Sequence, residues 1–201
     1  MKIRSLVCAN ALLSVLLSVG CASNNPEKIE PPNEQEFMEK WMAFATPTDR
    51  HAVLADKVGR WSVEVTFWMP GAPEPTTSTG ASDMRLTMDG RYLEDRFSGD
   101  FGGMPFSGQG LTGYDNMTHE YVGTWIDNMG TGIMVTRGTY DTATKTFEFH
   151  SAGPDVARGH YVPMRMVEKW SDKNHFVVEM FGPDFDGKEY MSMRMVYVRQ
   201  S

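Results

Sequence analysis

The feature that most constrains this chain is an alternation of apolar and polar residues that begins at Trp61. The first alternating segment has apolar side chains at every second position: Trp61, Val63, Val65, Phe67 and Met69. A period of two is that of a β-strand with one buried face, because successive side chains of a strand point to opposite sides. The rest of the chain continues in segments of about 8 to 12 residues without a helical period, which is typical of an all-β domain.

Turn signals separate these segments. They are short clusters of glycine, proline, asparagine and aspartate, the residues that tight turns favour: Pro70-Gly71, Asp89-Gly90, Gly102-Gly103, Asp115-Asn116, Asn128 to Gly130, Asp141 to Thr144, Gly153-Pro154, Asp172 to Asn174 and Asp184 to Gly187. Sequential hairpins predict an up-and-down meander of about 9–10 antiparallel strands. A sheet of that size splits into a sandwich or closes on itself, and sequential hairpins favour closure. We therefore expect an all-β fold, a single antiparallel β-barrel over residues 59–201.

The segment 34–58, which precedes the strands, has a helical period instead. Three aromatic residues recur at the spacing of one helix face: Phe37, Trp41 and Phe44. We expect one short amphipathic helix at 34–45 and a second from about Asp49 to Lys57. Because the aromatic face needs cover, these helices are expected to plug or flank one end of the barrel.

The first 20 residues have the layout of a secretory signal peptide. A basic start precedes a mostly apolar run of 14 residues from Leu6 to Val19. This run is shorter than the roughly 20 residues that a membrane-spanning helix needs. Gly20-Cys21 resembles the lipobox of bacterial lipoproteins, in which the cysteine becomes the lipidated first residue. We expect lipidation at Cys21; ordinary cleavage nearby is the alternative and would leave a free thiol.

Cysteine usage supports this prediction. Cys8 would leave with the signal peptide, so Cys21 would be the only cysteine of the mature chain and no internal disulfide could form. Ala22, rather than Asp, follows the cysteine, which in lipoproteins implies sorting to the outer membrane. We expect a lipid-anchored protein of the cell envelope that faces the periplasm from the outer membrane. Residues 21–33, which contain three prolines, would form a flexible tether.

The charge balance excludes one class of partner. Loss of residues 1–20 leaves 17 of the 19 basic residues against 26 acidic ones. An acidic chain lacks the basic face that nucleic-acid binding requires. Charge would not attract it to anionic headgroups either, so membrane association is expected through the lipid anchor.

Gly59-Arg60-Trp61, at the start of the first strand, resembles the G-x-W signature of lipocalins and their relatives. In those barrels the tryptophan plugs the closed end and a basic residue of the last strand lies over it, which implies this role for Arg199. Longer stretches resemble the bacterial family numbered 1579 among the domains of unknown function: GRYL (90–93), GGMPFSGQGLTGYDN (102–116), YVGTWIDNMGTGIM (121–134) and the closing DGKEY…MVYVR. The resemblance spans about residues 47–199, implies a lipocalin-like (calycin) barrel and brings no activity with it.

Polar side chains on otherwise apolar strand faces are the candidates for ligand contacts, because a buried charge needs a partner. Asp95 alternates in phase with Leu93 and Phe97. The other candidates also alternate in phase with apolar neighbours: Tyr121, Trp125, Asp127, Arg137 and Glu168. An arginine paired with an acid inside the barrel could orient the polar head of a ligand. The alternative for each charged residue is a position in water at a strand end.

Methionine is frequent, with 16 in the chain. Met191, Met193, Met195 and Tyr197 alternate on the last predicted strand. An inward stripe of this kind would line a soft apolar cavity, since methionine fills irregular volume and tolerates varied ligands. Ordinary barrel core is the alternative for any one of these residues.

No catalytic or metal-binding constellation is predicted. The sequence lacks a nucleophile elbow, a P-loop and the ligand spacing of a zinc site. Residues 108–113 match G-x-G-x-x-G, but a turn into another strand follows instead of the helix that a dinucleotide site requires, so we assign these glycines to strand bending. No cofactor is predicted; the alternative is haem, ligated by a lone histidine such as His150 or His160.

These observations favour a membrane-tethered barrel that binds a small apolar or amphipathic molecule without catalysis. An enzyme that acts on such a molecule is the second hypothesis, with Asp127, Arg137 or Glu168 as acid, base or orienting group. The third is an envelope scaffold whose barrel is filled by its own side chains.

Overall fold

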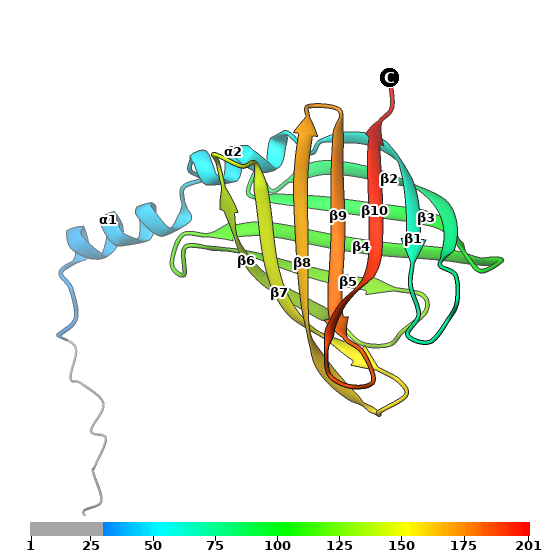
Figure 1. The fold of residues 1–201 in the computed structure, drawn as a ribbon. Helices are drawn as coiled ribbons and strands as arrows, with labels where there is room; N and C mark the ends of the chain where they lie inside the picture. The colour runs from blue at the N-terminus through cyan, green and yellow to red at the C-terminus, as the bar shows by residue number, and fades with distance from the viewer. Residues whose placement is uncertain (1–29) are drawn as a thin grey trace, which may run out of the picture.

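The computed structural model describes residues 30–201 and shows ten antiparallel strands closed into a barrel, with two helices before them (Figure 1). Each strand pairs with its neighbours in sequence, and β1 closes the barrel against β10. The elements are α1 (Glu34–Ala45), α2 (Asp49–Ala55), β1 (Gly59–Phe67), β2 (Thr76–Thr87), β3 (Tyr92–Phe101), β4 (Met104–Asp115), β5 (Glu120–Asp127), β6 (Met134–Asp141), β7 (Thr146–Asp155), β8 (His160–Asp172), β9 (His175–Pro183) and β10 (Glu189–Arg199). The predicted barrel with two N-terminal helices is confirmed. The predicted signal peptide and Cys21 lie outside the described residues.

β1 shows how the alternation produces the fold. Trp61, Val63 and Val65 point into the barrel and are at most 9% exposed, whereas Ser62 and Glu64 lie on the outer surface. Residues that pair across neighbouring strands point to the same face of a sheet. The pairing register, followed from β1 around the barrel, therefore identifies the inward residues of every strand.

One predicted turn is wrong. Gly153-Pro154 lies inside β7, and the turn to β8 follows at residues 156–159. Pro154 pairs with Tyr161 one residue before the end of its strand, where the missing N–H of proline is tolerated. Gly153 leaves room for the Met164 side chain, which a Cβ at this position would overlap.

α2 closes one end of the barrel. Its side chain Leu54 is 1% exposed and belongs to the barrel core. The Tyr121 hydroxyl donates to the Arg50 carbonyl at 2.7 Å. At the helix start, His51 accepts a hydrogen bond from the Thr48 N–H at 3.0 Å, and burial lowers the pKa of His51, which favours the neutral, accepting ring. We call this end of the barrel the α2 end.

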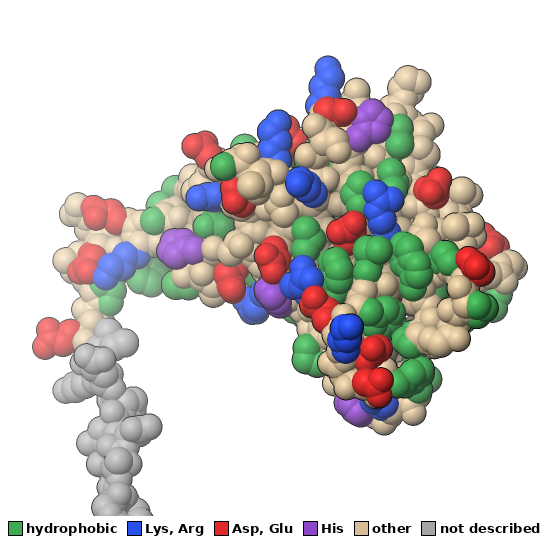
Figure 2. All heavy atoms as spheres, in the orientation of Figure 1, with side chains coloured by type: hydrophobic (Ala, Val, Ile, Leu, Met, Phe, Trp, Pro, Cys, Tyr) green, Lys and Arg blue, Asp and Glu red, His purple; other side chains and the backbone are tan. Residues whose placement is uncertain are grey.

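α1 does not cover the barrel, so the expectation that both helices plug or flank one end is wrong for this helix. None of its residues is buried, and Figure 2 shows hydrophobic side chains exposed along it. Phe37 and Trp41 contact each other instead, with ring centroids 6.2 Å apart. Asn116, in the turn after β4, holds the end of the helix by donating to the Phe44 carbonyl at 3.0 Å.

A contact between the first and last strands seals the α2 end. The Arg199 guanidinium lies 4.1 Å from the centroid of the Trp61 ring, which is fully buried. Gly59 allows this approach because a Cβ there would lie 2.6 Å from Arg199 Nη1, and because its φ of +138° is one that other residues rarely adopt. In the G-x-W segment, Trp61 thus plugs the barrel, and Gly59 leaves the space for the Arg199 guanidinium that covers the ring.

Arg199 also joins α2 to the barrel. It donates from Nη2 to the Asp56 carbonyl at 2.6 Å, from Nη1 to the Val58 carbonyl, and from Nε to the Lys173 carbonyl at 3.1 Å. The Asp56 and Val58 carbonyls follow directly after α2, where carbonyls lack partners within the helix. One side chain therefore fixes the chain after α2, β1 and the β8–β9 turn together.

We predict that Arg199→Met lowers the free energy of unfolding by about 2 kcal/mol, because the carbonyls after α2 lose their donor and Trp61 loses its covering cation. Urea unfolding followed by tryptophan fluorescence measures the change. Arg194→Met on the same strand is the control: its ion pair with Glu179 is 3.5 Å long and solvent-exposed, so its loss is expected to cost less than about 1 kcal/mol. Equal losses in the two variants would contradict the role assigned to Arg199.

Candidate functional site

The interior of the barrel has a sealed part and an accessible part. At the α2 end the inward side chains Trp61, Tyr121, Phe147 and Phe176 are at most 2% exposed. Farther from α2, inward side chains remain partly accessible: Phe67, Phe106, Trp125, Met164, Met166, Met180, Met193 and Met195. Because the strands close completely, solvent reaches such side chains through the interior. We call this accessible interior the lumen.

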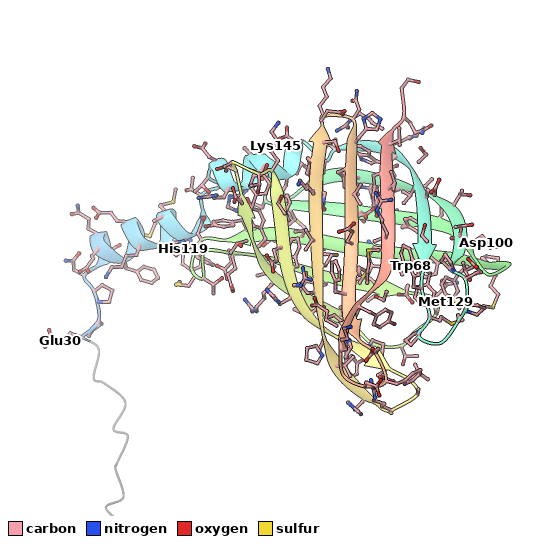
Figure 3. All side chains as sticks on the ribbon, viewed as in Figure 1. Glu30, Trp68, Asp100, His119, Met129 and Lys145 are labelled. Carbon is pink, nitrogen blue, oxygen red and sulfur yellow. The ribbon has the colours of Figure 1, made fainter. Side chains whose placement is uncertain are left out.

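The two rims of the barrel can be followed in Figure 3. Trp68, Asp100 and Met129 mark the rim opposite α2, and His119 and Lys145 mark the rim beside it. The partly accessible inward side chains lie toward the first of these rims, and the packed aromatic rings lie toward the second.

Inward glycines keep the lumen open. A Cβ on Gly108 would overlap the Trp125 ring, and one on Gly110 would lie 3.2 Å from it. A Cβ on Gly80 would likewise overlap the Phe97 ring. Both rings therefore lie against the wall in the space that the missing side chains leave, instead of projecting across the barrel. Gly108 and Gly110 of the G-x-G-x-x-G segment thus form part of the inner wall of the barrel.

The methionine stripe faces the lumen only in part. Met193, Met195 and Tyr197 pair with inward residues of β1 and β9. An irregularity in the register between Met191 and Met193 breaks the alternation, and Met191 pairs with Phe181 on the outer face. An inward stripe that includes Met191 is therefore wrong. An extra residue in a strand moves the side chains beyond it to the opposite face.

An ion pair lies inside the sealed part of the barrel. Lys57 Nζ lies 2.6 Å from Glu168 Oε2, with the two side chains 13% and 3% exposed. Trp170 donates its indole N–H to the other carboxylate oxygen of Glu168 at 2.9 Å. The Lys57 ammonium also lies over the rings of Phe147 and Phe176, 5.6 and 5.5 Å from their centroids. This ammonium is therefore fully engaged by one carboxylate and two aromatic faces.

Asp95 is another inward carboxyl, and no ion pair among residues 30–201 includes it. Its Oδ1 accepts a hydrogen bond from the Ser82 hydroxyl at 2.5 Å. Within residues 30–201, no hydrogen bond or ion pair involves Oδ2, and no buried side-chain oxygen lacks a partner, so Oδ2 faces accessible space. Burial raises the pKa of Asp95; the Ser82 hydrogen bond and the Lys57 charge oppose that rise.

Two further predicted residues, Trp125 and Asp127, lie together at the opposite rim. The Trp125 indole donates to Asp127 Oδ2 at 3.0 Å, while Asp127 Oδ1 accepts from the N–H groups of Met129 and Gly130. Asp127 thus orients the tryptophan and holds the following turn. Tyr121 lies at the sealed end, where burial raises its pKa to about 12. The structure therefore places the candidate residues at different depths and does not bring them into one cluster.

Arg137 does not face the lumen. It pairs with Val122 and His150, lies on the outer surface of β6 and forms a 3.4 Å ion pair with Glu120. Its alternation with Ile133 and Val135 was misleading because these two apolar residues are themselves 65% and 49% exposed. The haem candidates also lie outside: His150 is beside Glu148 on the outer face, and His160 is exposed at a strand end.

Sequence reasoning missed two residues of the interior. Lys57 was assigned to the end of the second helix, yet its side chain enters the barrel and meets Glu168, which is 111 positions away. Ser82 gave no signal because serine suits either face of a strand. No local pattern could have identified Lys57, since its partner lies on β8, 111 positions later in the chain.

Two hollows lie at the α2 end beside α2, and inward residues such as Tyr140, which lines both, form part of their walls. One, of about 490 Å³, lies between Val53, Trp170 and Arg199, and the other, of about 370 Å³, lies between Tyr114 and His119. Among residues 30–201, no group of three or more His, Cys, Asp or Glu side chains is placed to hold a metal ion. In the same part of the chain, no helix has the length and apolar character needed to cross a bilayer.

Comparisons with known proteins identify a family. The model of the family described as "Protein of unknown function (DUF1579)" matches residues 46–199. No curated protein matches the chain.

Two solved structures resemble the barrel. Rv2717c from M. tuberculosis has a TM-score of 0.58 at 12% identity, and the match covers 78% of this chain and 100% of that one. The S-type phycobiliprotein lyase CPES from Guillardia theta has a TM-score of 0.54 at 11% identity, covering 85% of this chain and 99% of that one. At such identities the resemblance concerns the fold alone.

The raised pKa of Asp95 predicts a pH-dependent stability. A carboxyl whose pKa is higher in the folded than in the unfolded state destabilises the fold when it ionises, so this loss grows as pH rises above the ordinary value of 3.8. Asp95→Asn removes the ionisation and keeps an acceptor for Ser82. We expect the variant to gain stability relative to the wild type as pH rises from 3 to 8, measured by urea midpoints.

Asp83→Asn is the matched control, because Asp83 is exposed on the outer face of β2 between Ser82 and Met84. It makes the same change in net charge on the outer face, from where the Asp83 charge raises the pKa of Asp95 less than burial does. A difference between Asp95→Asn and the wild type that stays constant or shrinks with rising pH would contradict the assignment.

Proposed function

This chain belongs to the DUF1579 family of proteins of unknown function, and from its geometry we propose that the barrel binds one small apolar or amphipathic molecule in the lumen without transforming it. The observation that carries the proposal is the partly accessible inner wall, on which the Trp125 ring lies against Gly108 and Gly110. A barrel that served only as a scaffold would gain stability by filling this space with side chains.

The composition of the wall favours an apolar ligand. Six methionines of the described residues point inward with partly accessible side chains: Met134, Met164, Met166, Met180, Met193 and Met195. Unbranched thioether side chains adapt to the shape of a bound molecule, and the aromatic faces add flat contact area. Ligand sites in proteins are largely apolar with few polar groups, and here Asp95 is one such group.

The positions of the charged residues argue against catalysis. Glu168 is held by Lys57 and Trp170, Asp127 holds a turn, and Arg137 lies outside. The residues that an enzyme of this barrel would use therefore do not converge on one reacting atom, as general acid–base catalysis requires. Binding without reaction is the function that the arrangement supports best.

Titration with N-phenyl-1-naphthylamine, a neutral apolar fluorophore, tests the proposal. We predict saturable binding of one molecule per chain, with energy transfer from the tryptophans of the barrel. Gly108→Ala is expected to weaken binding at least about fivefold, because the new Cβ pushes the Trp125 ring into the lumen. Absence of saturable binding to the wild-type protein would contradict the proposed function.

Gly182→Ala is the matched control. Gly182 is also an inward glycine, but the nearest atom to a Cβ there is Met164 Cγ at 3.9 Å, an ordinary contact. This variant should bind the fluorophore within about twofold of the wild type. Far-ultraviolet circular dichroism of both variants checks that the barrel forms. Equal weakening by the two substitutions would show that Trp125 does not shape the site.

The proposal includes a place in the cell, because the sequence predicts a signal peptide and a lipobox-like Gly20-Cys21. We expect the protein extracted from membranes to start at Cys21 and to carry added acyl mass. Intact-mass spectrometry of the wild type and a Cys21→Ser variant measures this. An unmodified Cys21 in the membrane-extracted wild type would contradict anchoring and leave the lumen proposal untouched.

A further inference from the structure

Two inward carboxyl groups near the sealed end, those of Glu168 and Asp95, lie near one ammonium, that of Lys57. The Lys57 ammonium is the cation of the interior ion pair, and its contact with Glu168 is 2.6 Å long and nearly sealed from solvent. Asp95 forms no ion pair in residues 30–201, although its carboxyl lies on the same inner wall. When ionised, it adds to this wall a negative charge that no ion pair of the described residues neutralises. A carboxylate in such surroundings is stabilised only by a cation or a hydrogen-bond donor.

The neighbours of Asp95 include a glycine that an aromatic ring covers. Its partner on β4 is Gly110, which has no side chain, and its partner on β2 is Met84. Gly110 in turn pairs with Trp125, whose ring lies over the two glycines of this segment. Phe97 follows two positions later on the same face of β3 and packs against Phe106 with ring centroids 5.7 Å apart. Asp95 is therefore flanked by aromatic side chains along its own strand and across β4.

A carboxylate beside aromatic faces is an arrangement suited to an organic cation. The carboxylate accepts a charge-assisted hydrogen bond from a protonated nitrogen, and the negatively polarised faces of Trp and Phe attract the same charge. A ligand that carried its own carboxylate would meet repulsion from Asp95, and Lys57 could not compensate because Glu168 already occupies it.

We infer that the polar end of the bound molecule is a protonated amine, held by the Asp95 carboxylate, while its apolar part lies against the methionines of the lumen. This inference rests on the proposed function, since it names the class of ligand for that same lumen. The Ser82 hydroxyl, which donates to Asp95 Oδ1, is a positioning group that leaves Oδ2 for the ligand.

Displacement of N-phenyl-1-naphthylamine by three probes of equal chain length tests the inference. The probes are dodecylamine, dodecanol and dodecanoate, each used below its micelle-forming concentration with the full-length protein. The wild type should bind dodecylamine at least about tenfold more tightly than dodecanoate. Asp95→Asn should weaken dodecylamine binding by about tenfold or more and leave dodecanol within about threefold.

Asp83→Asn is the control because it removes the same charge from the outer face of β2. It should leave the order of the three probes unchanged, which separates local contact from the overall charge of the protein. Equal affinities for the amine and the carboxylate, or an Asp95→Asn variant that binds the amine as the wild type does, would overturn the inference. If dodecanol and the fluorophore still bind in that case, the proposed function stands; if no probe binds, the proposed function fails as well.

Discussion

The contact of Arg199 with Trp61 determines the arrangement of the rest of the barrel. Its guanidinium covers the ring that plugs the α2 end and donates to the carbonyls of Asp56 and Val58, the residues on either side of Lys57. The main chain around Lys57 is thereby fixed so that its ammonium enters the barrel and meets Glu168. The same contact seals one end and places the cation that pairs with Glu168, whereas Asp95 forms no ion pair within residues 30–201.

The two ends of the barrel therefore have different physical tasks. At the α2 end, large aromatic side chains pack against one another. The rings of Trp61 and Phe176, for example, meet edge to face with centroids 4.8 Å apart. This packing stabilises the fold. Toward the opposite end, glycines replace large residues on the wall and the side chains lie flat. Filling the space there with side chains would make the protein more stable. Proteins commonly give up stability of this kind at sites that bind a ligand.

Much of this fold could be predicted from the sequence because its determinants are local. Alternation at Trp61, Val63 and Val65 identifies a strand, and glycine-rich turns give the meander. The position of α1 and the orientation of Arg137 could not be predicted, because period two does not tell inside from outside when both faces carry apolar residues such as Ile133. The pairing of Lys57 with Glu168 depends on barrel closure, which brings together residues that no local pattern connects.

The central claim is that the lumen holds a small molecule, and native mass spectrometry of the protein purified without denaturation tests it most directly. We expect a discrete additional mass that is lost on denaturation, at one molecule per chain, and that releases an intact amphipathic compound. A spectrum that shows only the mass of the protein, and stays unchanged after incubation with an envelope lipid extract, would contradict the claim and favour a barrel that serves as a scaffold.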